Sequence, residues 1–465
     1  MNHQKGSVHP YIPNSVPAVK QEMLAAVQAA SVDEFFEDIP PELLLEKDLQ
    51  LPEPFPDEYS LQRHVEGLLA QNTSCTERLS FLGAGCYQRH VPAVCDEINM
   101  RGEFLTAYAG EPYDDHGRFQ TLFEYCSMMG ELLNMEVVNV PTYDGYQAAA
   151  TALRMACRMT GRKKVLIGLA INPDKYSKIS EYLEPDIDID LAPFHSENGE
   201  LDIEALEVLL DESYAALYFE MPNYFGIFEK QAGSITAAAH LSGVECVVYV
   251  EPSSLGVIKP PADCGADIVC GDIQSLGMHM NYGGGQAGFI ATRDEERYVM
   301  EYPSRLFGIA PTRVPGEYGF GDVAYERTSF AVREEGKEWV GTAAALWGIT
   351  AGVYLALMGP SGMVELGEGI MARVKYAKTR LAEVPGVVIP HKEAVHFQEI
   401  LVNFDRSGKT AAEINQTLLT RGIFGGVDIS SVYPEFGQSA LFAFSEVHTQ
   451  ADIDTLVSAL KEVLA

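Results

Sequence analysis

The sequence is poor in positive charge. It has 33 Lys and Arg residues against 66 Asp and Glu among 465 residues, so its formal net charge is −33 at pH 7. A nucleic-acid backbone and an anionic membrane both attract a positively charged surface. We therefore expect neither nucleic acid nor a membrane as the main partner, although this balance leaves room for a local basic patch. The simplest location for such a chain is the cytoplasm.

The sequence also lacks the paired spacing that is typical of metal-binding and redox cysteines. None of its eight cysteines forms a Cys-x-x-Cys pair. His391 and His396 repeat at a spacing that suits a metal ligand pair, but no cysteine follows Cys270 to complete a site with them. We therefore predict reduced, mostly buried thiols and no metal site.

No apolar run follows the first charged residues, so we expect no secretory signal. One charge-free stretch, residues 339–364, is long enough to span a bilayer. Charged residues directly precede it, and it contains Thr342, Gly348, Thr350, Gly352, Gly359 and Pro360. We predict a helix buried in a large core.

The first 62 residues differ in composition from the rest. Residues 33–58 hold ten acidic residues, five prolines and one base, Lys47. We predict a short helix around 19–30, followed by an extended acidic arm. The arm is either a solvated linker or a segment that wraps a partner subunit. Its apolar residues, which need burial, favour the second interpretation: Phe35, Phe36, Leu43, Leu44 and Leu45.

Residues 63–335 alternate between helical periodicity and short apolar runs. The predicted helices are 147–160, 203–211 and 235–242, and the predicted strands are 163–169, 215–220, 245–251, 267–271 and 289–292. Short, almost continuously apolar strands between helices are typical of a mostly parallel sheet with both faces covered. At ~150 residues per domain the length indicates two or three units, and this segment is the large α/β domain.

Residues 336–465 follow another pattern. We predict a long linking helix at 363–383, strands at 387–389, 399–404 and 439–444, and helices at 411–421 and 451–464. This is a smaller α+β domain. The whole layout is that of the fold type I pyridoxal-phosphate enzymes, but layout alone is weak evidence for function. Such a site needs a Schiff-base lysine, a carboxylate for the pyridinium nitrogen and a helix N-terminus for the phosphate.

Several motifs resemble those of one family, the glycine-cleavage P-protein, subunit 1 (alpha). They are His9-Pro-Tyr-Ile-Pro-Asn14, Phe35-Phe-Glu-Asp-Ile-Pro40, Ser80-Phe-Leu-Gly-Ala-Gly85, Pro222-Asn-Tyr-Phe-Gly226, Ile258-Lys-Pro-Pro261, Gly265-Ala-Asp-Ile268 and Gly425-Gly-Val-Asp428. The resemblance implies a homologous beta subunit that holds pyridoxal 5′-phosphate on its lysine, in an α2β2 assembly. It also implies that the assembled enzyme decarboxylates glycine and transfers the aminomethyl group to a lipoyl carrier, the H-protein.

The resemblance further implies that this chain is a lysine-less relative of the beta subunit. Its residues Gln274, Ser275 and Leu276 lie where the beta chain places a His-Lys pair, and no lysine occurs between Lys259 and Lys337. We therefore predict that this chain forms no Schiff base. Lys259 is the nearest substitute, but two prolines follow it.

Two acidic residues stand where the resemblance places cofactor-binding groups. Asp144 directly precedes the predicted helix 147–160, so it suits a helix N-cap better than a phosphate neighbour. Glu251 follows the strand 245–250, where such folds keep the acid that pairs with the pyridinium. Contact with Asn223 or Ser253 would explain Glu251 equally well.

Two segments depart from the alpha-family pattern. The first is the loop from Tyr108 to Gly117, and the second is Arg333-Glu334, after which an acidic and apolar stretch replaces a basic one. The candidate site-lining or interface residues are Tyr108, Glu111, Tyr113, His116, Asn223, Glu251, Ser275, His279 and Arg333. Two alternatives stay open: a non-catalytic scaffold or regulatory subunit, and a subunit of a divergent pyridoxal enzyme that acts on another amino acid.

Overall fold

The computed structural model describes residues 8–9, 11–45, 47, 49–105, 116–338, 340 and 344–465. Within these ranges the side chains of residues 105, 116, 117 and 333 are not described. The chain divides into two compact units, Met1–Asn72 and Thr73–Ala465.

The first unit is helical and built from short elements. Its bounds are η1 (Pro13–Ser15), α1 (Pro17–Ala26), η2 (Val32–Phe36), η3 (Pro41–Leu43) and α2 (Glu58–Leu69). The prediction of an extended arm is wrong in detail, because η2 and η3 each form a 3₁₀ turn there. Ser31 caps η2, and Asp57 caps α2 by accepting a hydrogen bond from the Ser60 backbone N–H at 2.7 Å. Leu24 is the one buried apolar residue among the described residues of this unit.

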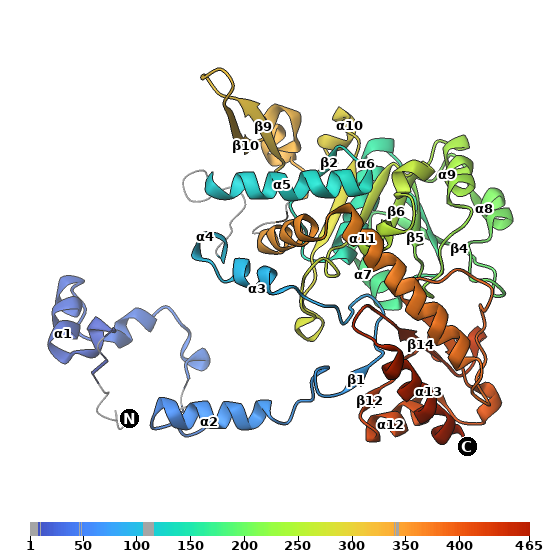
Figure 1. Cartoon of the computed structure of the whole chain (residues 1–465). Helices are drawn as coiled ribbons and strands as arrows, with labels where there is room; N and C mark the ends of the chain where they lie inside the picture. The colour runs from blue at the N-terminus through green and yellow to red at the C-terminus, as the bar shows by residue number, and fades with distance from the viewer. Residues whose placement is uncertain are drawn as a thin grey trace. The chain divides into compact units, whose positions relative to one another are not determined.

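The second unit is built around a seven-stranded sheet (Figure 1). Its strands are β2 (Val137–Val138), β3 (Lys164–Gly168), β4 (Asp188–Ala192), β5 (Ala216–Met221), β6 (Glu245–Val250), β7 (Ile268–Asp272) and β8 (Gly288–Thr292). Their order is β2-β8-β7-β6-β5-β3-β4. Strands β3 to β7 pair in parallel, and β8 runs antiparallel to both of its neighbours. This confirms the predicted, mostly parallel sheet.

The strands of the sheet are mostly apolar because both faces of the sheet are covered. Along β3, Val165 and Ile167 belong to one core cluster, whereas Leu166 belongs to the other. The first cluster packs under α6 (Gly145–Thr160), α7 (Pro173–Leu183) and α10 (Glu296–Val299). The second packs under α5 (His116–Leu133), α8 (Ile203–Leu209), α9 (Ala232–Leu241) and α11 (Ala345–Leu381). Alternate side chains of one strand therefore face two different cores.

Shorter elements surround the sheet. They are β1 (Leu79–Ser80), α3 (Ala93–Asn99), α4 (Gly102–Leu105), η4 (Pro252–Gly256), η5 (Pro261–Cys264), η6 (Asn281–Gly283), β9 (Phe307–Pro311), β10 (Tyr318–Asp322), η7 (Tyr325–Arg327) and η8 (Ser329–Glu335). The β9–β10 hairpin projects beside α5 (Figure 1), and its rings Phe307 and Phe320 pack on Phe119 and Phe123 of that helix.

Helix α11 begins at Ala345, well before the predicted start at residue 363. Gly359 has φ = 59°, so the helix has a break there and Pro360 opens a second segment. The first segment packs closely on α5, because a Cβ on Gly348 or Gly352 would lie 3.3 Å from Tyr125. Among the described helices α11 is the one long and apolar enough to cross a membrane, and 44% of its most apolar window is buried in the protein. A core helix of a soluble protein has the same properties, so this is weak evidence for a membrane span.

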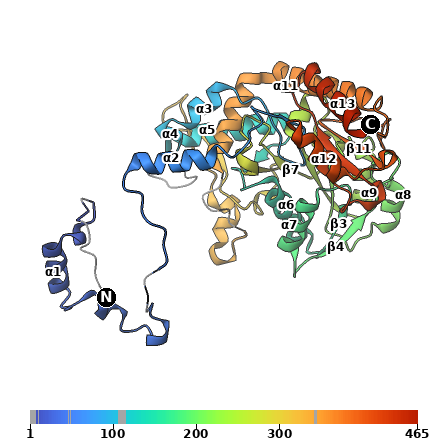
Figure 2. The same cartoon turned by 90° about the horizontal axis from the view of Figure 1, so that it is seen from below.

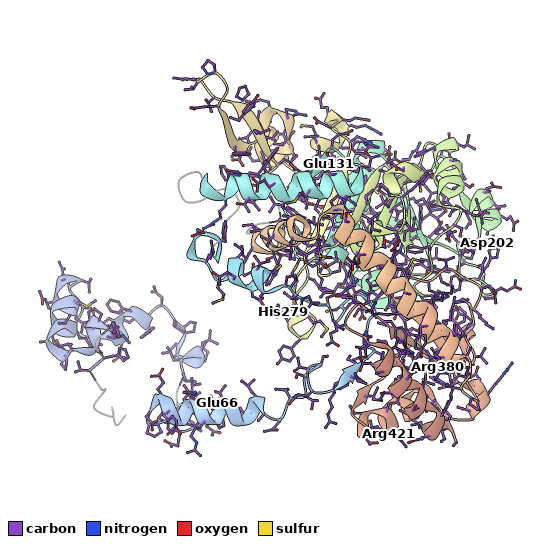
Figure 3. The ribbon with its side chains drawn as sticks, in the orientation of Figure 1. Glu66, Glu131, Asp202, His279, Arg380 and Arg421 are labelled. Carbon is purple, nitrogen blue, oxygen red and sulfur yellow. The ribbon has the colours of Figure 1, made fainter. Side chains whose placement is uncertain are left out.

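The small C-terminal domain is an antiparallel sheet, β11-β14-β13, with helices α12 and α13 (Figure 2). Its elements are β11 (Glu399–Asn403), η9 (Asp405–Ser407), α12 (Ala411–Thr420), β12 (Ile423–Phe424), β13 (Val427–Asp428), η10 (Pro434–Phe436), β14 (Ser439–Ala443) and α13 (Gln450–Leu464). The predicted strand 387–389 is wrong, because only an isolated bridge joins Val388 to Asn403. Arg380 of α11, which is labelled in Figure 3, donates to Asp454 of α13 at 3.0 Å.

Candidate functional site

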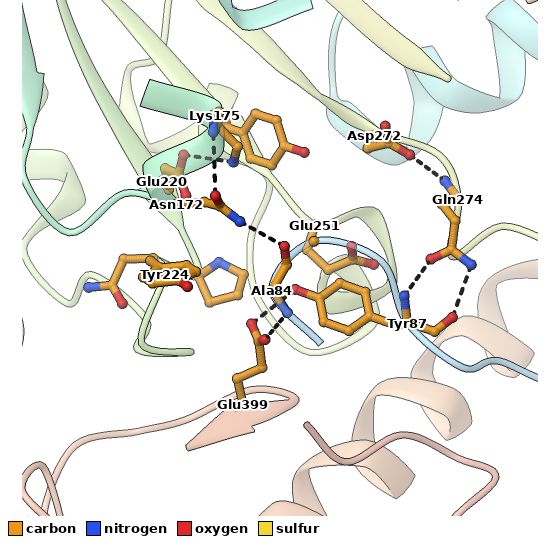
Figure 4. A pocket seen from close by; sticks show the side chains of 14 residues that line it. Ala84, Tyr87, Asn172, Lys175, Glu220, Tyr224, Glu251, Asp272, Gln274 and Glu399 are labelled. Carbon is orange, nitrogen blue, oxygen red and sulfur yellow. Dashed lines mark hydrogen bonds and ion pairs between the residues drawn. The ribbon is translucent and has the colours of Figure 1, made fainter. Parts of the chain in front are cut away.

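A polar pocket lies at the carboxyl ends of three parallel strands (Figure 4). Asn223 is the second residue after β5, Glu251 directly follows β6, and Asp272 ends β7. This is the edge at which open α/β sheets bind ligands. The segment that follows β1 and the first residue of the small domain's β11, Glu399, complete the lining. The cavity has a volume of about 40 Å³, which is room for a few water molecules.

A buried ion pair crosses the pocket. Lys175, in the first turn of α7, donates to Glu220 of β5 at 2.7 Å, and both side chains are 6% exposed. The Tyr218 hydroxyl donates to the same Glu220 oxygen at 2.7 Å. The Lys175 ammonium also lies 3.4 Å from the ring centre of Tyr249, a cation–π contact. Among the described lining residues Lys175 is the one lysine, and its ammonium is paired with Glu220 and packed on Tyr249.

The N-terminus of α6 is occupied by the chain's own carboxylates. Asp144 is the N-cap and accepts from the Gln147 backbone N–H at 2.7 Å, as the sequence predicts. Asp272 accepts from the Gly145 N–H at 2.8 Å and from the Gln274 N–H at 2.8 Å. Burial raises the pKa of Asp272 to about 7. These carboxylates hold the donors that a phosphate group would otherwise take.

Pyridoxal phosphate does not fit the residues of this pocket. Ser275 lies in the segment that corresponds, by the family resemblance, to the lysine-bearing segment of the beta subunit. Its side chain is 2% exposed and does not line the pocket, and its Oγ has no hydrogen-bond partner. The Gln274 amide is held by the backbone of Tyr87 and Met278. Neither a free amine nor a free helix N-terminus is present among the described lining residues. The described residues of this pocket therefore offer neither a free Schiff-base lysine nor a phosphate site.

Glu399 fastens the small domain to the segment that follows β1. It accepts from the Ala84 backbone N–H at 2.6 Å and from the Tyr87 hydroxyl at 2.9 Å (Figure 4). Burial raises the pKa of Glu399 to about 7. A Cβ on Gly83 would lie 2.5 Å from Glu399 Oε1, so glycine is required at this close approach. The Ser80–Gly85 motif of the sequence thus serves domain contact.

Arg89, in the segment that follows β1, also bonds to the small domain. Its guanidinium donates to Glu446 Oε2 at 2.9 Å and to Ser253 Oγ at 2.8 Å. Glu251 lies 3.6 Å from Arg89 and accepts from the Ser253 hydroxyl at 2.7 Å. The interpretation of Glu251 as held by Ser253 is therefore confirmed, and its carboxylate is paired within the chain.

The structure places the predicted site residues in three groups. Asn223 and Glu251 line the pocket, and the Asn223 side chain is bonded to the backbone of its own turn and to Gly199 O. His279 is exposed and bonds Asp96 at 3.0 Å, away from the pocket lining. Lys259 is exposed and also outside the lining.

The remaining candidates fall where side chains are not described. Tyr108, Glu111 and Tyr113 lie outside the described residues. His116 is the first residue of α5 and Arg333 lies in η8, but the side chains of these two residues are not described. Most other lining residues are not among the predicted candidates; those with an ionisable side chain are Tyr87, Lys175, Glu220, Tyr224, Tyr249, Asp272 and Glu399. An acidic residue inside an apolar strand was the available signal for Glu220, because a buried charge requires a partner.

Comparison with known proteins gives matches along nearly the whole chain. The model of the family "Glycine cleavage system P-protein" matches residues 9–460. The "Probable glycine dehydrogenase (decarboxylating) subunit 1" of Staphylothermus marinus is 37% identical, with 98% of each chain covered. The protein of the same name from Thermococcus onnurineus is 36% identical over 97% of this chain and 99% of its own.

Solved structures agree with the sequence matches. A crystal structure of glycine decarboxylase (P-protein) in inhibitor-bound form has a TM-score of 0.84 and 33% identity, covering 98% of this chain and 100% of that one. A sphingosine-1-phosphate lyase of Burkholderia pseudomallei, at 14% identity and a TM-score of 0.66 over 90% of this chain and 93% of its own, shares the fold alone. The predicted fold class and the family resemblance are both confirmed.

Proposed function

Because the chain belongs to the glycine cleavage system P-protein family, we propose that it is the lysine-less alpha subunit of a glycine decarboxylase. The observation that carries the proposal is a family match over residues 9–460 in a chain whose pocket lysine is paired with Glu220. Its partner is a homologous beta subunit that holds pyridoxal 5′-phosphate on its own lysine. The relatives named "subunit 1" support the existence of a second subunit.

The assembled enzyme releases CO2 from glycine and transfers the aminomethyl group to the lipoyl arm of an H-protein. Pyridoxal phosphate, bound to the partner, supplies an electron sink for the decarboxylation. The pocket of this chain is too small for a cofactor, because its cavity measures only about 40 Å³. The part of this chain is therefore to hold the partner's site in place and to exclude water from it. We propose an α2β2 assembly in the cytoplasm, with neither nucleic acid nor membrane as a partner.

Co-expression with the homologous lysine-bearing chain tests the proposal. We expect a yellow complex that exchanges labelled bicarbonate into the carboxyl group of glycine, whereas this chain alone is colourless. A yellow complex without glycine exchange would instead assign it to a pyridoxal enzyme for another amino acid. A partner that is equally active alone would assign this chain a scaffold role.

Borohydride reduction gives a second test, on this chain alone. We expect no pyridoxal to be fixed on Lys175 or Lys259, because the first is held by Glu220 and the second lies outside the pocket lining. Labelling of either lysine at a stoichiometry near one per chain would contradict the proposal. The matched control is the beta chain, whose lysine should be labelled under the same conditions.

A further inference from the structure

Three donor side chains of different chemistry meet at the opposite edge of the sheet. His240 lies in the last turn of α9, Cys246 is the second residue of β6, and Asp267 directly precedes β7. Strands β6 and β7 are parallel neighbours with Val247 opposite Ile268, so Cys246 and Asp267 lie side by side at the amino ends of the strands. The pocket described above lies at the carboxyl ends, so the two places are separate.

The cluster is tight. His240 Nε2 lies 2.8 Å from Asp267 Oδ2, and the Cys246 backbone N–H donates to the same oxygen at 2.7 Å. The imidazole nitrogen, the thiol sulfur and a carboxylate oxygen all lie within 4.8 Å of one another. We propose that these three side chains form a binding site for a divalent transition metal of the zinc type, with water as the fourth ligand.

The donor set and the spacing support a tetrahedral site. Zinc binds sulfur at about 2.3 Å, imidazole nitrogen at about 2.0–2.1 Å and carboxylate oxygen at about 2.0–2.2 Å. Tetrahedral angles then place the ligand atoms about 3.3–3.6 Å apart. The farthest donor atoms would need to approach by at most about 1.5 Å, whereas His240 Nε2 and Asp267 Oδ2, now 2.8 Å apart, would need to separate slightly. The His240 side chain ends a helix and is 45% exposed, so it is free to adjust and water can reach the fourth position.

The sulfur has little other bonding to lose. Cys246 is fully buried, and its Sγ makes one long contact, 3.8 Å to the Thr236 carbonyl oxygen. Metal binding would convert the thiol to a thiolate and release one proton to solvent. The bound ion would tie α9, β6 and β7 together at their ends and so stabilise the folded chain. The ion would lie at the edge of the sheet opposite the pocket, so it would take no direct part in chemistry there.

The spacing of these residues explains why the sequence predicts no metal site. Cys246 lies six positions after His240, and Asp267 lies 21 positions after Cys246. The familiar zinc signals rest on ligand pairs in one turn or hairpin. Here each ligand belongs to a different element, and only the pairing of β6 with β7 brings them together.

Titration of the chelator-treated full chain with Co²⁺ tests the site. We expect one equivalent to produce an ultraviolet thiolate-to-cobalt charge-transfer band and tetrahedral d–d bands, and Zn²⁺ to displace it and raise the melting temperature. Cys246→Ser should abolish the charge-transfer band. The control is Cys264→Ser, which removes a partly exposed thiol outside the donor set and should keep the band.

A second variant covers the case in which Cys246→Ser fails to fold. His240→Gln changes a partly exposed side chain and should weaken Co²⁺ binding by at least about tenfold while the apoprotein keeps its melting temperature. The proposal is overturned if wild type gives no charge-transfer band with Co²⁺, if Cys264→Ser removes the band, or if His240→Gln binds Co²⁺ as tightly as wild type. None of these outcomes bears on the glycine reaction, which is assayed separately.

Discussion

Removing the positive charge of Lys175 should destabilise the chain strongly. In Lys175→Met the Glu220 carboxylate stays buried beside Tyr218 without its cation. Loss of one partner from a buried ion pair costs about 3–5 kcal/mol, because the remaining charge is not solvated. Glu220→Gln should cost less, because Tyr249 still faces the ammonium at 3.4 Å and such a contact contributes about 2 kcal/mol when desolvated.

The matched control is another lysine–carboxylate pair of equal length. Lys164 and Asp190 are also 2.7 Å apart, but their side chains are 34% and 45% exposed. Lys164→Met should therefore change the unfolding free energy by only about 0–1 kcal/mol. The unfolding free energy of each variant is measured by urea unfolding followed by circular dichroism. The variants are compared only if the slope of that free energy against urea concentration, the m value, stays constant. Lys175→Met with Glu220→Gln should be more stable than Lys175→Met alone. Equal losses for Lys175→Met and Lys164→Met would refute the reasoning.

Three further predictions concern protonation, turnover and assembly. Because the pKa of Asp272 is raised to about 7, the folded chain binds the proton of this carboxyl group more tightly than the unfolded chain does. Protonated Asp272 therefore contributes stability that is fully present below about pH 4 and is lost as the pH rises through 7. Relative to wild type, Asp272→Asn should gain unfolding free energy between about pH 4 and 7; a constant difference would contradict this. Glu111→Gln with Tyr113→Phe should lower turnover of the assembled enzyme about tenfold or more without changing its sedimentation, through lost positioning contacts; unchanged kinetics would remove both residues from the site. Deleting residues 33–58, whose apolar side chains are exposed in this chain, should weaken association with the partner, as measured by sedimentation velocity. Unaltered association would show that this segment is a solvated linker.

The sequence predicts the sheet well and the connections less well. Strands such as β5 are found because buried parallel strands are continuously apolar and flanked by helices. Residues 387–389 are equally apolar, but only Val388 pairs with another strand, and pairing depends on a distant partner. Gly359 and Pro360 are typical of a helix end, yet a positive φ at Gly359 allows a second helical segment to follow directly.

The candidate site was predictable only where residues follow strands. Asn223 comes two residues after β5 and Glu251 directly after β6, so their place at the sheet edge follows from topology. Lys175 reaches Glu220 from a helix 45 residues away, and Tyr87 reaches Glu399 across 312 residues. Neither spacing is local, so no periodicity in the sequence reports these contacts.

The pairing of β1 with β12 has a consequence for the order of folding. Leu79 pairs with Ile423, so 344 residues lie within the closed loop (423 − 79). Loop-closure entropy grows as (3/2)RT ln n, which makes this closure about 3 kcal/mol more costly than that of a 10-residue loop. During synthesis the Tyr87 hydroxyl lacks Glu399 and the Arg89 guanidinium lacks Glu446 until the small domain has left the ribosome. The pocket is therefore completed late, and a chain truncated before Ile423 should retain its central sheet but lack an ordered pocket.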